Sequence, residues 1–313
     1  MTLREGTEPV HAVRSRVNDT VFILGPARSG TSLLYKVLCM HPQALWLSNW
    51  VARFPRNPWL AALNRPSRGF KGARRRVWFG GGTNAYVFGR PRPWFERLFP
   101  MPVEGEPVYA ACGVTQIGEF SAAAMASPAA ALRRTVAAVR RASGGAVFVN
   151  KRIANNRRIR FLHHAFPDAR FVSLVRDGRA VALSLSRVDW WDDSFVWWYG
   201  GSPDRWRAEG RDPWEICARN WVEELHEIRD GLRLVPEDQI FRLRYEDLVA
   251  DPIPILGRLA QFAGLPASSR WRDALRALEF SERDAWKTDL EPDVTARITS
   301  IQAEELEAHG YGT

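Results

Sequence analysis

The stretch that decides the fold is TVFILGPARSGTSLL, residues 20–34. It begins with five β-branched or apolar residues, passes through a turn that contains Gly25 and Gly30, and continues in a helical pattern from Thr31. A buried strand that runs through a glycine-bearing turn into a helix is a common phosphate-binding arrangement, because the backbone N–H groups at the helix start attract an anion. The stretch therefore predicts an α/β fold that binds an anion.

This loop departs from the nucleoside triphosphate motif at one position. Its glycines have the spacing of GxxxxGK[ST], but Thr31 stands where that motif has the lysine that reaches the β- and γ-phosphates. A triphosphate with magnesium is therefore disfavoured. What remains is a set of backbone N–H groups, with Arg28, Ser29, Thr31 and Ser32 as further donors, which suits a shorter phosphate group. The alternative is simple helix capping by Thr31.

Short apolar runs alternate with helical patterns along the chain, which indicates βαβ units and a mainly parallel sheet covered on both faces. We predict a three-layer α/β/α fold of P-loop type with a long insertion after the first βα unit. The expected strands are 21–25, 146–150, 170–175 and 239–244, and the expected helices are 31–40, 130–142, 153–165, 180–187 and 213–229.

We interpret residues 1–313 as one domain, because an α/β core with surface insertions can reach this length. Residues 1–19 form an N-terminal extension. Residues 50–120 are rich in Pro, Gly, Trp and Arg, and we expect them to form an insertion that serves as a lid or binding loop. Residues 188–214 contain six tryptophans, each expected to pack locally, although the cluster could wall an acceptor pocket.

The composition is basic, with 44 lysines and arginines against 35 acidic residues and a formal net charge of +9. Such a surface favours the binding of nucleotides, nucleic acids, anionic membranes or sulfated and phosphorylated substrates. The alternative is that the excess of arginine reflects a compositional bias of the source genome. The three cysteines have neither disulfide nor zinc spacing. We see no signal peptide and no apolar run long enough to span a bilayer, so we expect a cytoplasmic location.

A second basic constellation follows the later strands. Lys151 ends the run FVNK, and in RFVSLVRDGRAVALSLSR Arg176 comes directly after a strand, with Ser184 about two helical turns further on. Because ligands of open α/β sheets bind at the carboxyl ends of strands, Arg28, Lys151 and Arg176 are expected to converge. The alternative for Arg176 and Asp177 is a salt bridge with a helix cap.

Together, three motifs resemble the sulfotransferases that use 3′-phosphoadenosine 5′-phosphosulfate (PAPS). PARSGTSLL resembles the family's loop for the 5′-phosphosulfate, RDGRAVALS its 3′-phosphate motif, and RYEDLVADP the segment after its late strand. The similarity covers roughly residues 20–45, 146–187 and 239–265, and it is closest to the branch of protein-tyrosine and carbohydrate sulfotransferases. It implies a metal-independent enzyme that moves a sulfuryl group to a hydroxyl, less readily to an amine, of a glycan, glycolipid or other metabolite.

The resemblance also assigns roles to residues of this chain. Lys151 would lie near the bridging oxygen of PAPS, and Tyr245 would touch the nucleotide or only pack. Lys287, beside Trp286, would add a charge near a phosphate or remain a surface lysine. The residues assigned to the phosphosulfate are Arg28, Ser29, Gly30, Thr31 and Ser32, and those assigned to the 3′-phosphate are Arg176 and Ser184.

Catalysis in such a site would resemble phosphoryl transfer. Arg28 and Lys151 would stabilise the negative charge that develops on the sulfonate and on the leaving phosphate oxygen. The general base is harder to find, because HPQALWLSNW lacks the glutamate that the tyrosine-sulfating branch has after its HP. We expect the base to come from the insertion or just after it, with Glu106 preferred and Glu104 and Glu119 as alternatives. The adjacent histidines, His163 and His164, are expected to pack within a helix.

Two other functions stay open at this point. One is a phosphotransferase of the P-loop class, which the missing lysine opposes. The other is a nucleic-acid-binding protein, for which RGFKGARRRVWF at residues 68–79 is the stretch with interleaved basic and aromatic residues. The resemblance predicts that the protein has no specific nucleic-acid partner. The sequence does not indicate the oligomeric state.

Overall fold

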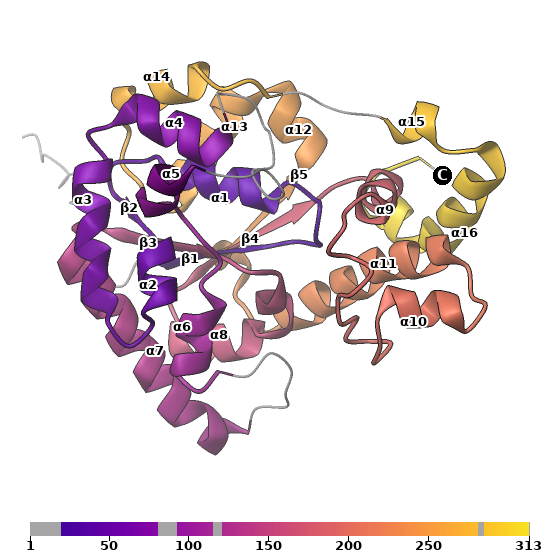
Figure 1. Ribbon diagram of the computed structural model, residues 1–313, viewed down its shortest axis with the longest axis horizontal. Coiled ribbons are helices and arrows are strands. Elements are labelled where there is room, and N and C mark those ends of the chain that lie inside the picture. The colour runs from indigo at the N-terminus through magenta and orange to yellow at the C-terminus, as the bar shows by residue number, and fades with distance from the viewer. Residues whose placement is uncertain (1–19, 81–92, 115–120, 281–284, 313) are drawn as a thin grey trace, which may run out of the picture.

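The computed structural model describes residues 20–80, 93–114, 121–280 and 285–312. Within these ranges five strands form one sheet in the order β2-β3-β1-β4-β5, and every neighbouring pair is parallel (Figure 1). The predicted α/β fold with a central parallel sheet is confirmed. The strands are β1 (Thr20–Leu24), β2 (Ala44–Leu45), β3 (Val147–Lys151), β4 (Arg170–Val175) and β5 (Ile240–Arg244).

Alternate residues of β1 face two different cores, which is why this strand reads as a continuous apolar run. Val21 and Ile23 belong to the core on one face of the sheet, and Phe22 and Leu24 to the core on the other. The first core is covered by α1 (Thr31–Cys39), α4 (Lys71–Phe79), α12 (Tyr245–Ala250), α13 (Pro252–Phe262) and α14 (Ser269–Arg276). The second is covered by α2 (Asn49–Arg53), α6 (Glu106–Ala111), α7 (Ala122–Ser143) and α8 (Ile159–Ala165).

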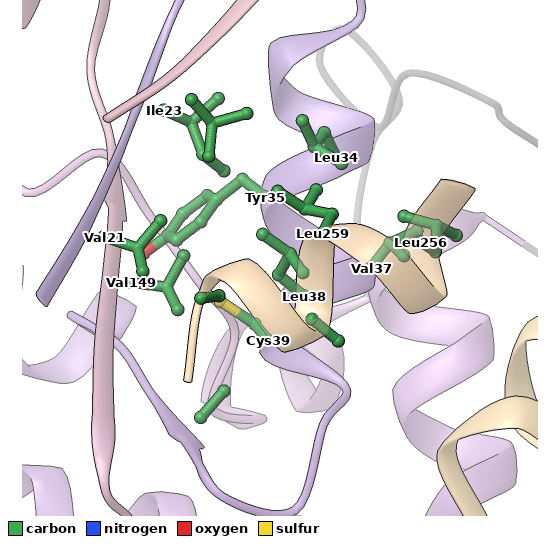
Figure 2. Close-up of a cluster of buried hydrophobic side chains, with 14 of the residues drawn as sticks. Val21, Ile23, Leu34, Tyr35, Val37, Leu38, Cys39, Val149, Leu256 and Leu259 are labelled. Carbon is green, nitrogen blue, oxygen red and sulfur yellow. The ribbon is translucent and has the colours of Figure 1, made fainter. Parts of the chain in front are cut away.

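The packing of α1 on the sheet positions the loop that precedes it. Figure 2 shows side chains of α1 lying between the strands β1 and β3 and the helix α13. Each fully buried leucine or valine contributes about 1.5–3 kcal/mol, so the helix start is held firmly. The residues labelled in this cluster are Val21, Ile23, Leu34, Tyr35, Val37, Leu38, Cys39, Val149, Leu256 and Leu259.

A third apolar cluster lies beyond the carboxyl end of β4, at the right of Figure 1. It joins α9, which follows β4, to three other helices, and Trp206 and Trp221 are almost completely buried in it. This cluster fixes α9, which carries Ser184 near its end and is preceded by Arg176, the two residues predicted to bind the 3′-phosphate. Its helices are α9 (Gly178–Ser186), α10 (Pro203–Ala208), α11 (Pro213–Leu232) and α16 (Pro292–Ala308).

The insertion expected over residues 50–120 is largely helical in its described parts. Its helices have only four to nine residues, too few turns for a periodic pattern to be visible in the sequence. Besides α2, α4 and α6 they are η1 (Pro58–Leu63), α3 (Asn64–Ser67) and α5 (Trp94–Leu98), and the remaining short elements of the chain are η2 (Ile153–Arg157), η3 (Glu237–Gln239) and α15 (Trp286–Asp289).

Two expected helices differ most from their predicted bounds. α7 begins at Ala122, where Ser121 caps it, and continues through Pro128, because its apolar face is buried against the second core. The helix expected over 153–165 is divided into η2 and α8. Asn155 and Asn156 in η2 use their side chains for hydrogen bonds to Tyr109 and Gly25, which lie far away in the chain, and this explains the interruption.

Candidate active site

Four strands bring predicted residues to one edge of the sheet. Gly25 follows β1, Lys151 ends β3, Arg176 follows β4 and Tyr245 follows β5. A cavity of about 880 Å³ opens at this edge, and Lys151, Arg176, Tyr245 and Arg28 all line it. β1 is the central strand, flanked by β3 and β4, so the cavity lies at the topological switch point of the sheet, where open α/β folds bind ligands.

The loop after β1 has a backbone that few residue types can adopt. A Cβ at Gly25 would lie 2.3 Å from the carbonyl oxygen of Leu174, and the φ of this glycine is 149°. Asn156 holds Gly25 on both sides: Oδ1 accepts from its N–H and Nδ2 donates to its carbonyl oxygen, each at 3.1 Å. Arg28 adopts a φ of 69°, a left-handed conformation that is uncommon outside glycine and is typical of ligand-binding turns.

The start of α1 is suited to an anion. Its N-cap is Gly30, which has no side chain to cap the helix, and no acidic residue lies in the first turn, so Thr31 does not occupy the N-cap position. Ser29 is fully buried, and its Oγ has no hydrogen-bond partner among the described residues. A phosphate-like group here would satisfy both the helix N–H groups and this hydroxyl.

The guanidinium groups of Arg28 and Arg176 lie close to the loop backbone and to Ser184. Arg28 Nε donates to Ser184 Oγ at 2.8 Å, and Arg176 Nη1 donates to the carbonyl oxygen of Arg28 at 3.2 Å. Asp177, in contrast, accepts hydrogen bonds from the backbone and side chain of Arg179 and caps α9. The expected phosphate ligands of two separate motifs therefore form one basic surface.

Tyr245 packs against the loop. A Cβ at Gly30 would lie 2.5 Å from Cδ2 of its ring, so only glycine fits beneath it. The guanidinium carbon of Arg176 lies 4.7 Å from the centre of the same ring. Because Tyr245 also lines the cavity, both roles considered for it, packing and nucleotide contact, are compatible with its position.

Lys151 is buried and shares a carboxylate with its neighbour in sequence. Its Nζ forms an ion pair with Oε1 of Glu104, and Arg152 Nη1 lies 2.6 Å from Oε2 of the same group. Burial alone would raise the pKa of Glu104, but the charges and hydrogen bonds of Lys151 and Arg152 outweigh burial and hold this pKa below its ordinary value. An ionised carboxylate that lines the cavity therefore lies beside Lys151.

Glu106, the preferred base in the sequence, is directed elsewhere. It accepts hydrogen bonds from Arg158 Nη2 at 2.8 Å and from Arg152 Nε at 3.1 Å, and it is absent from the described residues that line the cavity. Arg158 is almost completely buried, so Glu106 neutralises a charge inside the protein. Burial raises the pKa of Glu106, but Arg158 and Arg152 lower it by more. Glu119 lies outside the described residues.

The remaining candidates lie away from the strand ends. Lys287 is exposed and does not line the cavity, whereas its neighbour Trp286 does and stacks on Arg179, with 4.2 Å between the guanidinium carbon and the ring centre. His163 packs edge-on against an aromatic ring of β4, and His164 is exposed. The sequence reasoning missed Trp286 as a lining residue.

Part of the tryptophan-rich segment forms one wall of the cavity. Four aromatic side chains form this wall, which we call the aromatic wall. They differ in exposure, from Trp191, which is nearly buried, to Phe195, which is 64% exposed. Ser194, which lies between them, turns its hydroxyl to the carbonyl oxygen of Trp190 at 2.7 Å. The members of the aromatic wall are Trp190, Trp191, Phe195 and Trp197.

Glu224 connects the aromatic wall to the loop. Its Oε1 accepts from Trp197 Nε1 at 3.1 Å and from Arg157 Nη1 at 2.7 Å, and its Oε2 accepts from Asn156 Nδ2 at 2.6 Å. Arg157 and Glu224 both line the cavity, yet neither was singled out from the sequence. The available signal was the basic run KRIANNRR directly after β3, which contains both Asn156 and Arg157.

In the described part of the chain, no group of three or more His, Cys, Asp or Glu side chains could hold a metal ion. None of the helices described is long and apolar enough to cross a bilayer.

Comparison with known proteins gives a family match and two informative structural likenesses. A family model for the sulfotransferase family matches residues 20–269, which confirms the resemblance seen in the motifs. The sulfotransferase STF9 from Mycobacterium avium superimposes with a TM-score of 0.59 at 16% identity, over 95% of this chain and 78% of that chain. The sulfotransferase STF1 from Mycobacterium tuberculosis H37Rv gives 0.56 at 16% identity, over 93% and 78%. At this identity the two structures share the fold alone, and no curated protein matches.

Proposed function

The chain belongs to the sulfotransferase family, and we propose that it transfers the sulfuryl group of PAPS to a hydroxyl group on an acceptor with an uncharged, largely apolar body. The observation that carries this proposal is the position of Glu104 beside Lys151 in the cavity at the phosphate loop. A cation for the leaving group and a carboxylate for the acceptor proton are the two groups that such a transfer needs.

The loop after β1, together with Arg176 before α9 and Ser184 near the end of α9, would hold the donor. The uncapped start of α1 with Arg28 and the buried Ser29 hydroxyl suits the 5′-phosphosulfate, and Arg176 with Ser184 suits the 3′-phosphate. Gly30, Thr31 and Ser32 contribute backbone and side-chain donors, as the resemblance implies. Lys287 remains a weaker proposal, because its side chain does not line the cavity.

The chemistry requires an acceptor oxygen to replace the phosphate oxygen on sulfur, with loss of the acceptor proton. Lys151 would stabilise the negative charge that develops on the leaving oxygen, and Arg28 the charge on the sulfonate. Glu104 would take the proton. Its lowered pKa keeps it ionised at neutral pH, and its ion pair with Lys151 sets the two groups side by side. We therefore propose Glu104 as the base in place of Glu106.

The aromatic wall supports an apolar acceptor. Trp197 Nε1 donates into the protein, to Glu224, so the wall presents mainly ring surface to the cavity. The nearby cations already face carboxylates: Arg157 meets Glu224, and Arg187 meets Asp289 at 2.9 Å. An acidic acceptor would gain little from these paired cations. A glycolipid or an apolar alcohol fits better than a free glycan.

Isothermal titration with 3′-phosphoadenosine 5′-phosphate (PAP), AMP and ATP without magnesium tests the donor site. PAP is expected to bind most tightly, and Arg176→Ala is expected to weaken PAP about 10- to 100-fold and AMP far less, because a charge-assisted phosphate contact is lost. The matched control is Arg219→Ala, which removes an exposed arginine of α11 that pairs with Glu215. Equal binding of AMP and PAP would contradict the proposal, and preference for ATP would favour a phosphotransferase.

Trp190→Ala and Phe195→Ala test the acceptor class. Each is expected to raise the KM for 2-naphthol about tenfold, through loss of buried ring surface, and to leave the KM for PAPS unchanged. Steady-state kinetics would compare 2-naphthol, its carboxylated analogue 6-hydroxy-2-naphthoate, and methyl glucoside. If the wild-type enzyme preferred the carboxylate or the glucoside, the donor assignment would stand and the apolar acceptor class would be wrong.

A further inference from the structure

The positive charge of the chain is concentrated in one stretch. Residues 50–80 contain eight lysines and arginines and no acidic residue, a net charge of +8 within a chain whose total is +9. Two of the eight are directed into the protein, where Arg68 and Arg74 donate to backbone carbonyl oxygens. The exposed ones are Arg53, Arg56, Arg65, Lys71, Arg75 and Arg76.

The same region exposes large apolar side chains. Nine large hydrophobic residues are exposed in the described part of the chain, and six of them lie between residues 54 and 98, so they are as concentrated as the charge. Trp94 is 72% exposed and Phe70 61%. The six are Phe54, Trp59, Leu63, Phe70, Trp94 and Leu98.

The elements that carry these side chains are neighbours in space. Trp50 Nε1 of α2 donates to the carbonyl oxygen of Leu98 in α5 at 2.7 Å, and Glu96 of α5 lies 3.4 Å from Arg76 of α4. η1 and α3 follow α2 along the chain. Figure 1 shows α2, α3, α4 and α5 together on the left side of the molecule. We call the six exposed basic residues and the six exposed apolar residues named above the basic-aromatic face.

We propose that the basic-aromatic face docks on the surface of an anionic lipid bilayer. Arginine and lysine side chains attract the phosphates of anionic lipids, and Trp, Phe and Leu side chains enter the boundary between headgroups and acyl chains. An exposed apolar patch on a positively charged surface promotes aggregation of a free protein. On an anionic membrane the same patch strengthens binding. The face has the charge complementarity that this partner requires.

A nucleic acid is the other large polyanion to consider, and the composition of the face favours the bilayer. Bases stack on aromatic rings, but Leu63 and Leu98 offer no stacking surface. A bilayer accepts aliphatic and aromatic side chains alike. The exposed leucines therefore distinguish the two partners.

The face is also connected to the cavity. α4 begins at the exposed Lys71 and ends at the buried Phe79, which lines the cavity, and a helix of nine residues is about 13 Å long. If the proposed function holds, docking would bring the cavity close to acceptors that reside in the membrane. The docking itself does not depend on that function.

Co-sedimentation of the full chain with phosphatidylcholine vesicles, with and without phosphatidylglycerol, tests the proposal at low salt. The expected result is binding only to vesicles that contain phosphatidylglycerol. Lys71→Gln with Arg75→Gln is expected to weaken it about 25-fold, at about fivefold per charge. Trp59→Ser with Phe70→Ser is expected to weaken it about tenfold or more. The matched controls are Arg160→Gln with Arg233→Gln, and Leu234→Ser, which alter exposed residues outside the face.

The outcomes separate clearly. Selective loss in both face variants, with unchanged controls and normal turnover of a water-soluble acceptor, supports docking. Failure to bind the anionic vesicles, or equal loss in the controls, overturns it. A third outcome also overturns it, in favour of a nucleic-acid partner. In that outcome an RNA or DNA oligonucleotide binds tightly and displaces the vesicles, and its binding is weakened by the charge variant but not by the aromatic variant.

Discussion

Lys151→Ala is expected to lower kcat about 10²- to 10³-fold while the Kd for PAP changes less than about threefold. Lys151 is 3% exposed and lines the cavity, where a fixed cation can stabilise charge on the leaving oxygen that is present only in the transition state. Steady-state kinetics at saturating PAPS give kcat, and calorimetric titration with PAP gives the Kd.

One further variant and a test of folding make the Lys151 result interpretable. Lys151→Arg keeps the charge in a bulkier group and is expected to retain more activity than the alanine variant. Circular dichroism and Tm verify that each variant is folded, because Lys151→Ala also removes the partner of a carboxylate. A folded Lys151→Ala enzyme with near-normal turnover would show that this lysine has no catalytic role.

Glu104→Gln is expected to lower kcat about 10²- to 10⁴-fold, the range for loss of a general base. The loss should be smaller for an acidic acceptor such as 4-nitrophenol than for an aliphatic alcohol, because an acidic hydroxyl needs less help to lose its proton. Lys151 and Arg152 hold the pKa of Glu104 below 4.5, so wild-type kcat/KM should stay constant from neutral pH to below pH 4.5. It should fall only where this carboxyl becomes protonated.

Glu106→Gln is the matched control for Glu104→Gln. It removes the charge of a carboxylate that binds Arg158 and Arg152 and does not itself line the cavity, so it should lower the Tm and change kcat only a few-fold. The assignment of the base would be wrong if Glu106→Gln lowered kcat more than Glu104→Gln does. It would also be wrong if Glu104→Gln lowered kcat equally for 4-nitrophenol and for an aliphatic alcohol.

The sequence predicted the parts of the site that depend on local backbone. The strand, the glycine turn and the helix from Thr31 occupy the expected positions, because each follows from residues next to one another in the chain. The convergence of Arg28, Lys151 and Arg176 on one cavity followed from a general rule, that parallel strands end at the same edge. The two-residue strand β2 was too short to leave a pattern.

The choice between Glu104 and Glu106 could not be made from the sequence. Between them lies Gly105 with a φ of 78°, which turns the chain into α6 and directs the two carboxylates to different partners. Glu104 meets Lys151 and Glu106 meets Arg158, residues more than 45 positions away in the chain. The aromatic wall was similarly undetermined, because six tryptophans in one segment do not reveal which of them pack in the core.

The hydrogen bonds of Glu224 set limits on how this enzyme can change its substrate during evolution. Trp197 shares this buried carboxylate with Arg157 and with Asn156, which in turn holds the loop at Gly25. Substitutions at Trp197 would therefore disturb the donor side as well. Trp190 and Phe195 are 41% and 64% exposed, and they can vary without that penalty. Under the proposed function, the pocket thus combines a constrained end on the donor side with an adaptable end where new acceptor specificities can arise.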